Sequence, residues 1–82
     1  MEEAKARQAL RAWVVHRGNV SDELLKDDSV LVSEGFINSL DVLDLIDTLE
    51  TLRGRPVDTL ALKGEEFRSI DSLIDSFFKG TV

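Results

Sequence analysis

The sequence predicts an all-α fold, a small four-helix bundle with three main helices, a short third helix and a long loop between the first two. Three segments carry apolar residues at the i, i+3, i+4 spacing of an amphipathic helix, and none shows the strict alternation of a half-buried strand. With 82 residues, of which 43% are hydrophobic, the chain suits a single domain, residues 1–82. Such a domain has one small core that buries roughly 60% of the unfolded surface.

The first helix is expected over residues 2–17. One face carries the apolar residues Ala6, Leu10, Trp13 and Val14. Gly18-Asn19 is a typical helix end, because glycine and asparagine accept the left-handed conformation that follows a last helical turn. His16 is the one histidine and lies near this end. It has no second histidine or triad partner, so it predicts no catalytic role.

Residues 20–37 predict a long, partly ordered loop that packs down through separated apolar anchors. These anchors are Leu24, Leu25, Val30, Leu31, Val32, Phe36 and Ile37. Residues 21–25 can form a single helical turn. The neighbouring cluster Asp27-Asp28-Ser29 lacks the regular acidic spacing and the closing glutamate of a calcium loop, so it is interpreted as solvated charge.

The second helix is expected over residues 39–52. Gly35 permits a tight turn ahead of it, and the side chain of Asn38 can cap the helix by accepting a free amide of the first turn. This cap puts Ser39 at the first helical position with its hydroxyl in solvent. Asp41 can reach back to the cap in a shortened capping box.

The two faces of this helix differ in chemistry. The buried stripe consists of Val42, Leu45, Ile46, Leu49 and Leu52. The exposed face carries Asp41, Asp44, Asp47 and Glu50. The helix stops in the segment 53–56, where a glycine cap and a proline end it and two arginines complement its negative end.

The last third of the chain predicts two further elements. Residues 57–62 are a short connector, and residues 63–68 have room for only a turn or two of helix, pinned by Phe67. Ser69 then caps a last helix that is expected to end at Gly80. Its apolar residues follow the i, i+3, i+4, i+7, i+8 rule and are Ile70, Leu73, Ile74, Phe77 and Phe78.

The composition excludes several classes of site. The chain has no cysteine, so it forms no disulfide, thiolate metal site or cysteine nucleophile. It also lacks a glycine-rich phosphate loop, a metal-ligand set and paired carboxylates in a catalytic setting, so we expect no enzyme activity, catalytic residue or metal. The acidic N-terminus and the absence of a long apolar run predict a cytoplasmic protein without a membrane segment.

The net charge of -6 is unevenly distributed. Residues 1–17 carry four bases against two acids, and residues 53–82 carry five of each. Between residues 18 and 52, nine acids face a single lysine, a balance of -8. The negative electrostatic field of this segment repels nucleic acid and attracts basic protein surfaces. We therefore expect a basic protein partner and no nucleic acid.

The chain resembles the acyl carrier protein family, including its aminoacyl and peptidyl carriers. In that family an Asp-Ser-Leu triplet opens the second helix, and Asn38-Ser39-Leu40 corresponds to it here, within residues 35–41. The acidic second helix, the loop before it, the short third helix and residues 66–73 extend the resemblance over most of the chain. The family's usual aspartate is replaced by Asn38, which caps a helix about as well.

The resemblance implies a function as a carrier. A phosphopantetheinyl transferase would attach a 4′-phosphopantetheine arm to Ser39, and the arm would hold an acyl or aminoacyl group as a thioester. A helix start with free amides tolerates such a phosphate well. Leu40 would be an exposed apolar contact beside the arm. A docking face for basic patches of the loading ligase or transferase and of downstream synthases would be formed by Asp41, Asp44, Asp47 and Glu50.

The carrier is expected to be a monomer. The arginines of residues 53–56 depart from housekeeping fatty-acid carriers and favour a dedicated aminoacyl, peptidyl or secondary-metabolic carrier. Two other interpretations stay open. One is a helical adaptor that binds a basic partner through residues 39–52 without a prosthetic group, and the other is a degenerate carrier that is never modified.

The family's triplet also occurs at a second serine of the chain. The literal Asp-Ser-Leu occurs at residues 71–73. Ser72 is expected inside the last helix, after the cap Ser69, with neither a glycine turn nor free amides to receive a phosphate. The sequence therefore predicts Ser39 as the attachment site.

Overall fold

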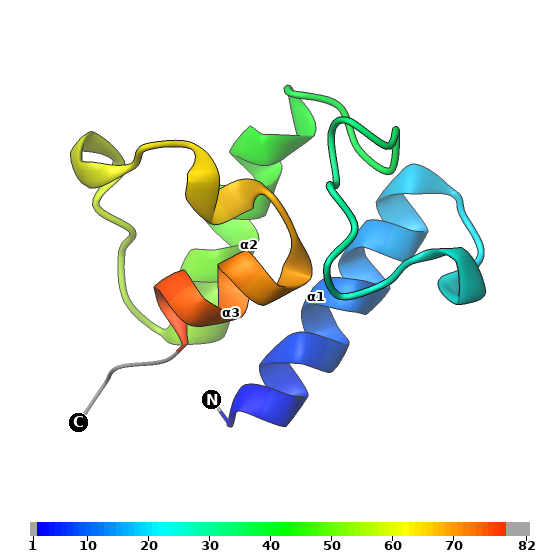
Figure 1. The fold of residues 1–82 in the computed structure, drawn as a ribbon. Helices are drawn as coiled ribbons and strands as arrows, with labels where there is room; N and C mark the ends of the chain where they lie inside the picture. The colour runs from blue at the N-terminus through cyan, green and yellow to red at the C-terminus, as the bar shows by residue number, and fades with distance from the viewer. Residues whose placement is uncertain (1, 79–82) are drawn as a thin grey trace.

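The computed structural model describes residues 2–78, which form three α-helices joined by loops and short 3₁₀ turns (Figure 1). The α-helices are α1 (Glu3–Gly18), α2 (Asp41–Arg53) and α3 (Ile70–Phe77). The 3₁₀ turns are η1 (Asp22–Leu24), η2 (Thr59–Ala61) and η3 (Glu65–Phe67). These residues contain no β-strand, so the all-α prediction is confirmed for them. None of their helices has the length and apolar character that crossing a membrane requires.

The predicted short third helix is only one 3₁₀ turn, η3. Gly64 starts this turn with a φ of 96°, and Ser69 ends the segment in an extended conformation, with φ -150° and ψ 171°. The carboxylate of Glu66 accepts hydrogen bonds from the amides of Lys63 (3.1 Å) and Gly64 (2.9 Å) ahead of the turn. The four-helix prediction is therefore correct only in part, because too few residues separate these two breaks for an α-helix.

The end of α1 is capped by Asn19, which takes the left-handed conformation (φ 53°) in place of Gly18. The amides of Asn19 and Val20 both donate to the carbonyl of Val15, the second at 3.2 Å. This pattern satisfies a carbonyl of the last turn. The helix thus ends within one residue of the predicted position.

The loop between η1 and α2 is folded around Leu31, whose side chain is fully buried. The Leu31 amide donates to the carbonyl of Arg68 (2.8 Å), next to α3. Its carbonyl accepts hydrogen bonds from the amides of Phe36 (2.9 Å) and Ile37 (3.1 Å). Gly35 makes the predicted turn, with a φ of 83°. The loop is therefore ordered, and it brings the chain to the start of α2 in a defined position.

Ion pairs fasten the first part of this loop to α1, and α1 in turn to α3. Asp27 accepts from Arg7 (2.8 Å) and from Arg11 (2.7 Å), and Arg7 also donates to Asp71 of α3 (2.6 Å). Burial acts to raise the pKa of Asp27, but the hydrogen bonds from Arg11 and Arg7 outweigh it and leave the pKa below its ordinary value. The prediction that this acid is merely solvated is therefore wrong for Asp27.

One apolar core lies between the three α-helices, with α3 crossing the middle of the molecule (Figure 1) and packing against α1 and η3. Its buried residues are Ala6, Leu10, Val14, Leu25, Leu31, Phe36, Ile37, Leu45, Leu49, Val57, Phe67, Ile70, Leu73, Ile74 and Phe77. Trp13 and Val42 are partly buried against this core. Two predicted loop anchors, Leu24 and Val32, are instead exposed. The predicted helix end at Gly80 lies outside the described residues.

Candidate functional site

The start of α2 is closed by a reciprocal pair of hydrogen bonds between Asn38 and Asp41. The side-chain oxygen of Asn38 accepts from the amide of Asp41 (2.9 Å), and a carboxylate oxygen of Asp41 accepts from the amide of Asn38 (3.0 Å). This is the shortened capping box that the sequence predicts. Two amides that a helix start leaves without partners are thereby satisfied.

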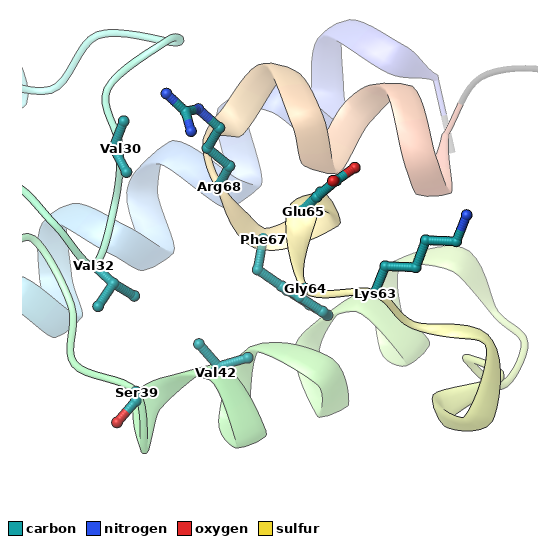
Figure 2. Close-up of a pocket in the computed structure, with 9 residues that line it drawn as sticks. All are labelled: Val30, Val32, Ser39, Val42, Lys63, Gly64, Glu65, Phe67 and Arg68. Atoms are coloured by element: carbon teal, nitrogen blue, oxygen red, sulfur yellow. The ribbon is translucent and has the colours of Figure 1, made fainter.

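Ser39 lies in the turn between these two residues, and α2 begins at Asp41, two residues later than predicted. The amide of Asp41 also donates to the carbonyl of Asn38 at 3.1 Å, and the amide of Leu43 donates to the carbonyl of Leu40 at 3.2 Å. These i to i+3 bonds tighten the first turn, so that it is not α-helical. The side chain of Ser39 is exposed as predicted, and Figure 2 shows its oxygen pointing away from the neighbouring side chains.

An apolar groove of about 580 Å³ opens beside Ser39 (Figure 2). Its walls come from the loop before α2, from the first turns of α2 and from η3, and include Val30, Val32, Val42 and Phe67. Lys63, Glu65 and Arg68 add charged groups to the lining. A group attached to Ser39 would therefore have an apolar surface within reach. The sequence pattern did not predict this groove, because its walls are distant from one another along the chain.

Two acids of the predicted docking face are paired with α1. Arg17 donates to Asp44 at 2.6 Å and, from the same nitrogen, to Asp41 at 3.4 Å. The hydrogen bond to Asp44 raises the pKa of Arg17 above its ordinary value. The guanidinium also lies over the ring of Trp13, 4.9 Å from its centre, a distance at which a cation is attracted to the ring face. Asp41 and Asp44 are therefore partly neutralised within the protein.

The other two acids differ from each other. Glu50 accepts a hydrogen bond from the amide of Val57 (2.8 Å) and so fastens the chain that follows α2. The carboxylate of Asp47 is exposed and makes no hydrogen bond or ion pair with any residue from 2 to 78. Asp47 is therefore the acid of the predicted docking face that is most open to a partner.

Two exposed leucines lie beside the acids on α2. Leu40 is 74% exposed, as predicted, and Leu43 is 64% exposed. Sequence reasoning missed Leu43, although it lies outside the buried stripe and three residues after Leu40, on the same face. We call this surface the α2 ridge, defined as Leu40, Leu43, Asp44 and Asp47.

Ser72 has a different environment from Ser39. It lies inside α3 and is half-buried. Its amide donates to the hydroxyl of Ser69, and the two hydroxyls are 3.1 Å apart. The Ser72 hydroxyl therefore already has a partner within the protein, and it has no preceding glycine turn.

The start of α2 thus combines an exposed serine on a defined turn, an apolar groove and the α2 ridge. Of the predicted site residues, Ser39, Leu40, Asp44 and Asp47 present exposed side chains here, whereas Asp41 and Glu50 bond to backbone amides. No protein-family model matches this chain, and no curated protein matches it either.

Proposed function

We propose that this protein is a carrier of the acyl-carrier type, which holds an acyl or aminoacyl group as a thioester on a 4′-phosphopantetheine arm at Ser39. The observation that carries the proposal is the exposed Ser39 hydroxyl on a turn that Asn38 and Asp41 fix by reciprocal hydrogen bonds. A serine that must enter the active site of another enzyme needs both exposure and a defined backbone. Ser39 has both.

The residues around Ser39 fit such an arm. Its hydroxyl makes no hydrogen bond with other described residues, so modification breaks no internal contact. The chain has no cysteine, and the arm supplies the thiol that thioester chemistry requires. The groove offers Val32 and Val42 as apolar contacts to the arm or to its cargo. Apolar area removed from water there contributes about 25 cal/mol per Å².

The α2 ridge suits a partner surface with an apolar patch and basic side chains. Leu40 and Leu43 supply the apolar contact, and Asp47 supplies a charge that forms no ion pair within residues 2–78. Electrostatic complementarity of this kind mainly raises the rate of encounter, which serves a protein that meets several enzymes in turn. We propose a phosphopantetheinyl transferase, a loading ligase or transferase and downstream synthases as these partners.

The charges at the other end of α2 support a narrower proposal for the kind of carrier. Arg53 lies over the ring of Phe77, 5.4 Å from its centre, and donates to the carbonyl of Pro56 (3.3 Å). Arg53 and Arg55 make this end of the helix basic, unlike the acidic continuation of housekeeping fatty-acid carriers. The difference supports a dedicated aminoacyl, peptidyl or secondary-metabolic carrier.

Intact-mass measurement tests the proposal directly. The protein is incubated with coenzyme A and a broad-specificity phosphopantetheinyl transferase, and a gain of one phosphopantetheinyl group is expected. Ser39→Ala should fold normally and gain nothing, whereas Ser72→Ala should be modified like the parent. Peptide mapping that located the group on Ser72 would overturn the site. An unmodified parent, beside a carrier that the same transferase does modify, would contradict the proposal and leave the helical adaptor and the never-modified carrier as the interpretations.

A further inference from the structure

The last turn of α1 touches the Ser39 turn from two directions. From one direction, Arg17 reaches Asp41 and Asp44 at the start of α2. From the other, Gly18 packs against the carbonyl of Phe36, two residues before Asn38. Sequence reasoning gave Arg17 no role and treated Gly18 only as a helix end.

Arg17 reaches the Ser39 turn through a single carboxylate. One oxygen of Asp41 accepts from Arg17 (3.4 Å), and its other oxygen accepts from the amide of Asn38 (3.0 Å). Asn38 and Asp41 flank Ser39, so Arg17 holds the carboxylate of Asp41, which closes the Ser39 turn. The shorter bond to Asp44 (2.6 Å) and the contact with Trp13 hold the guanidinium in place. Loss of Arg17 would leave the Asp41 carboxylate held only by the amide of Asn38.

Position 18 requires glycine because a side chain there would clash with a neighbouring segment, not because of its backbone conformation. Its φ is not positive, unlike those of Gly35, Gly54 and Gly64. A Cβ atom built on Gly18 would lie 2.1 Å from the carbonyl oxygen of Phe36. Relief of that overlap requires a backbone shift of at least about 1 Å, because Cβ atoms essentially never make contacts shorter than 3.0 Å. One of the two backbones in this contact, that of Phe36, leads directly to Ser39.

We propose that Arg17 and Gly18 are positioning residues that fix the Ser39 turn relative to the α2 ridge. This inference rests on the proposed function, because it concerns how Ser39 is presented to the transferase. Neither residue lies on the reacting hydroxyl, so both act through the Asn38–Asp41 turn. A nucleophile displaced by about 1 Å can lose up to about a hundredfold in rate.

The kinetic test compares variants with the transferase, separating kcat from KM. Arg17→Ala is expected to lower kcat a few-fold without raising KM, because the freed acids still attract a basic partner. Gly18→Ala is expected to lower kcat by about tenfold or more. Arg17→Lys keeps the charge but not the guanidinium that lies over the ring of Trp13, and should retain only part of the parental kcat.

Two control variants match these changes. Lys5→Ala makes the same charge change at the other end of α1, and should leave kcat at the parental value. Gly54→Ala places an alanine at a φ of 73°, where it is strained, at the far end of α2. It should lower stability but not kcat. If Gly18→Ala does not fold, Arg17→Ala and Arg17→Lys decide the question.

A second measurement does not depend on modification. Solvent exchange of the Asn38 amide, followed by NMR in the unmodified protein, reports its hydrogen bond to Asp41 directly. Faster exchange in Arg17→Ala and Gly18→Ala than in the controls supports the inference, even if the transferase never modifies Ser39. Parental exchange and parental kcat in both variants would overturn the inference while leaving a modified Ser39, and hence the proposed function, intact.

Discussion

Arg17 on α1 donates a 2.6 Å hydrogen bond to the carboxylate of Asp44 on α2, across 27 positions of the sequence. The two side chains are 36% and 58% exposed, so the pair stands at the surface. It neutralises part of the acidic face beside Ser39. The acids of α2 are therefore not equivalent, and substitutions can separate their roles.

Asp47→Lys should raise KM for the transferase several-fold at low salt, because it reverses the unpaired charge of the α2 ridge. The effect should shrink with added salt, since charges at a surface are screened over about 8 to 10 Å at ordinary ionic strength. Stability should change by less than about 1 kcal/mol. Glu23→Lys makes the same charge change on η1, and an equal effect there would contradict a docking role for Asp47.

Asn38→Ala should destabilise the protein by about 1 kcal/mol, because the amide of Asp41 loses its side-chain acceptor. In a domain of this size that corresponds to a decrease of roughly 4 to 8 °C in the melting temperature. Asn38→Asp keeps an acceptor oxygen and should melt close to the parent. Thermal melts followed by circular dichroism check both, and equal melting temperatures for Asn38→Ala and the parent would rule out the capping role.

Leu49→Ala should cost about 2 to 5 kcal/mol, because Leu49 is fully buried and its removal leaves a cavity. Leu40→Ala removes a similar side chain that is 74% exposed, and should be far milder. Chemical denaturation of the two variants measures the difference. Similar losses from both would show that the faces of α2 are assigned wrongly.

Asp27→Asn should destabilise the protein at neutral pH and flatten its acid dependence. The pKa of Asp27 is below its ordinary value of 3.8, because the hydrogen bonds from Arg11 and Arg7 outweigh the effect of burial. A carboxylate with a lowered folded pKa adds stability that is complete above the unfolded pKa and is lost as pH falls through the folded value. The difference between parent and variant should therefore be largest above about pH 4 and shrink below it.

Melting temperatures measured from neutral pH to about pH 2 test this window. Asp28→Asn is the matched control, because the adjacent aspartate is exposed and undergoes the same chemical change. Its melting curve should follow that of the parent at each pH. A variant Asp27→Asn whose stability falls with acid as steeply as the parent's would show that this ion pair is not a source of the acid sensitivity.

The sequence alone determined the features that depend on neighbours along the chain. The spans of α1 and α2 were predicted to within about two residues, and the buried positions Leu45 and Leu49 followed from helical spacing. The reciprocal bonds of Asn38 and Asp41 were predicted as well, because residues three apart at a helix start meet in one backbone geometry. Local geometry fixes such contacts before any segment packs against another.

Only the tertiary structure decided the features that join distant segments. The pairing of Arg17 with Asp44, the contact of Gly18 with Phe36 and the groove beside Ser39 all depend on how α1, η3 and the loop dock on α2. No local periodicity encodes these distances, because they follow from the packing of side chains that are far apart in the sequence.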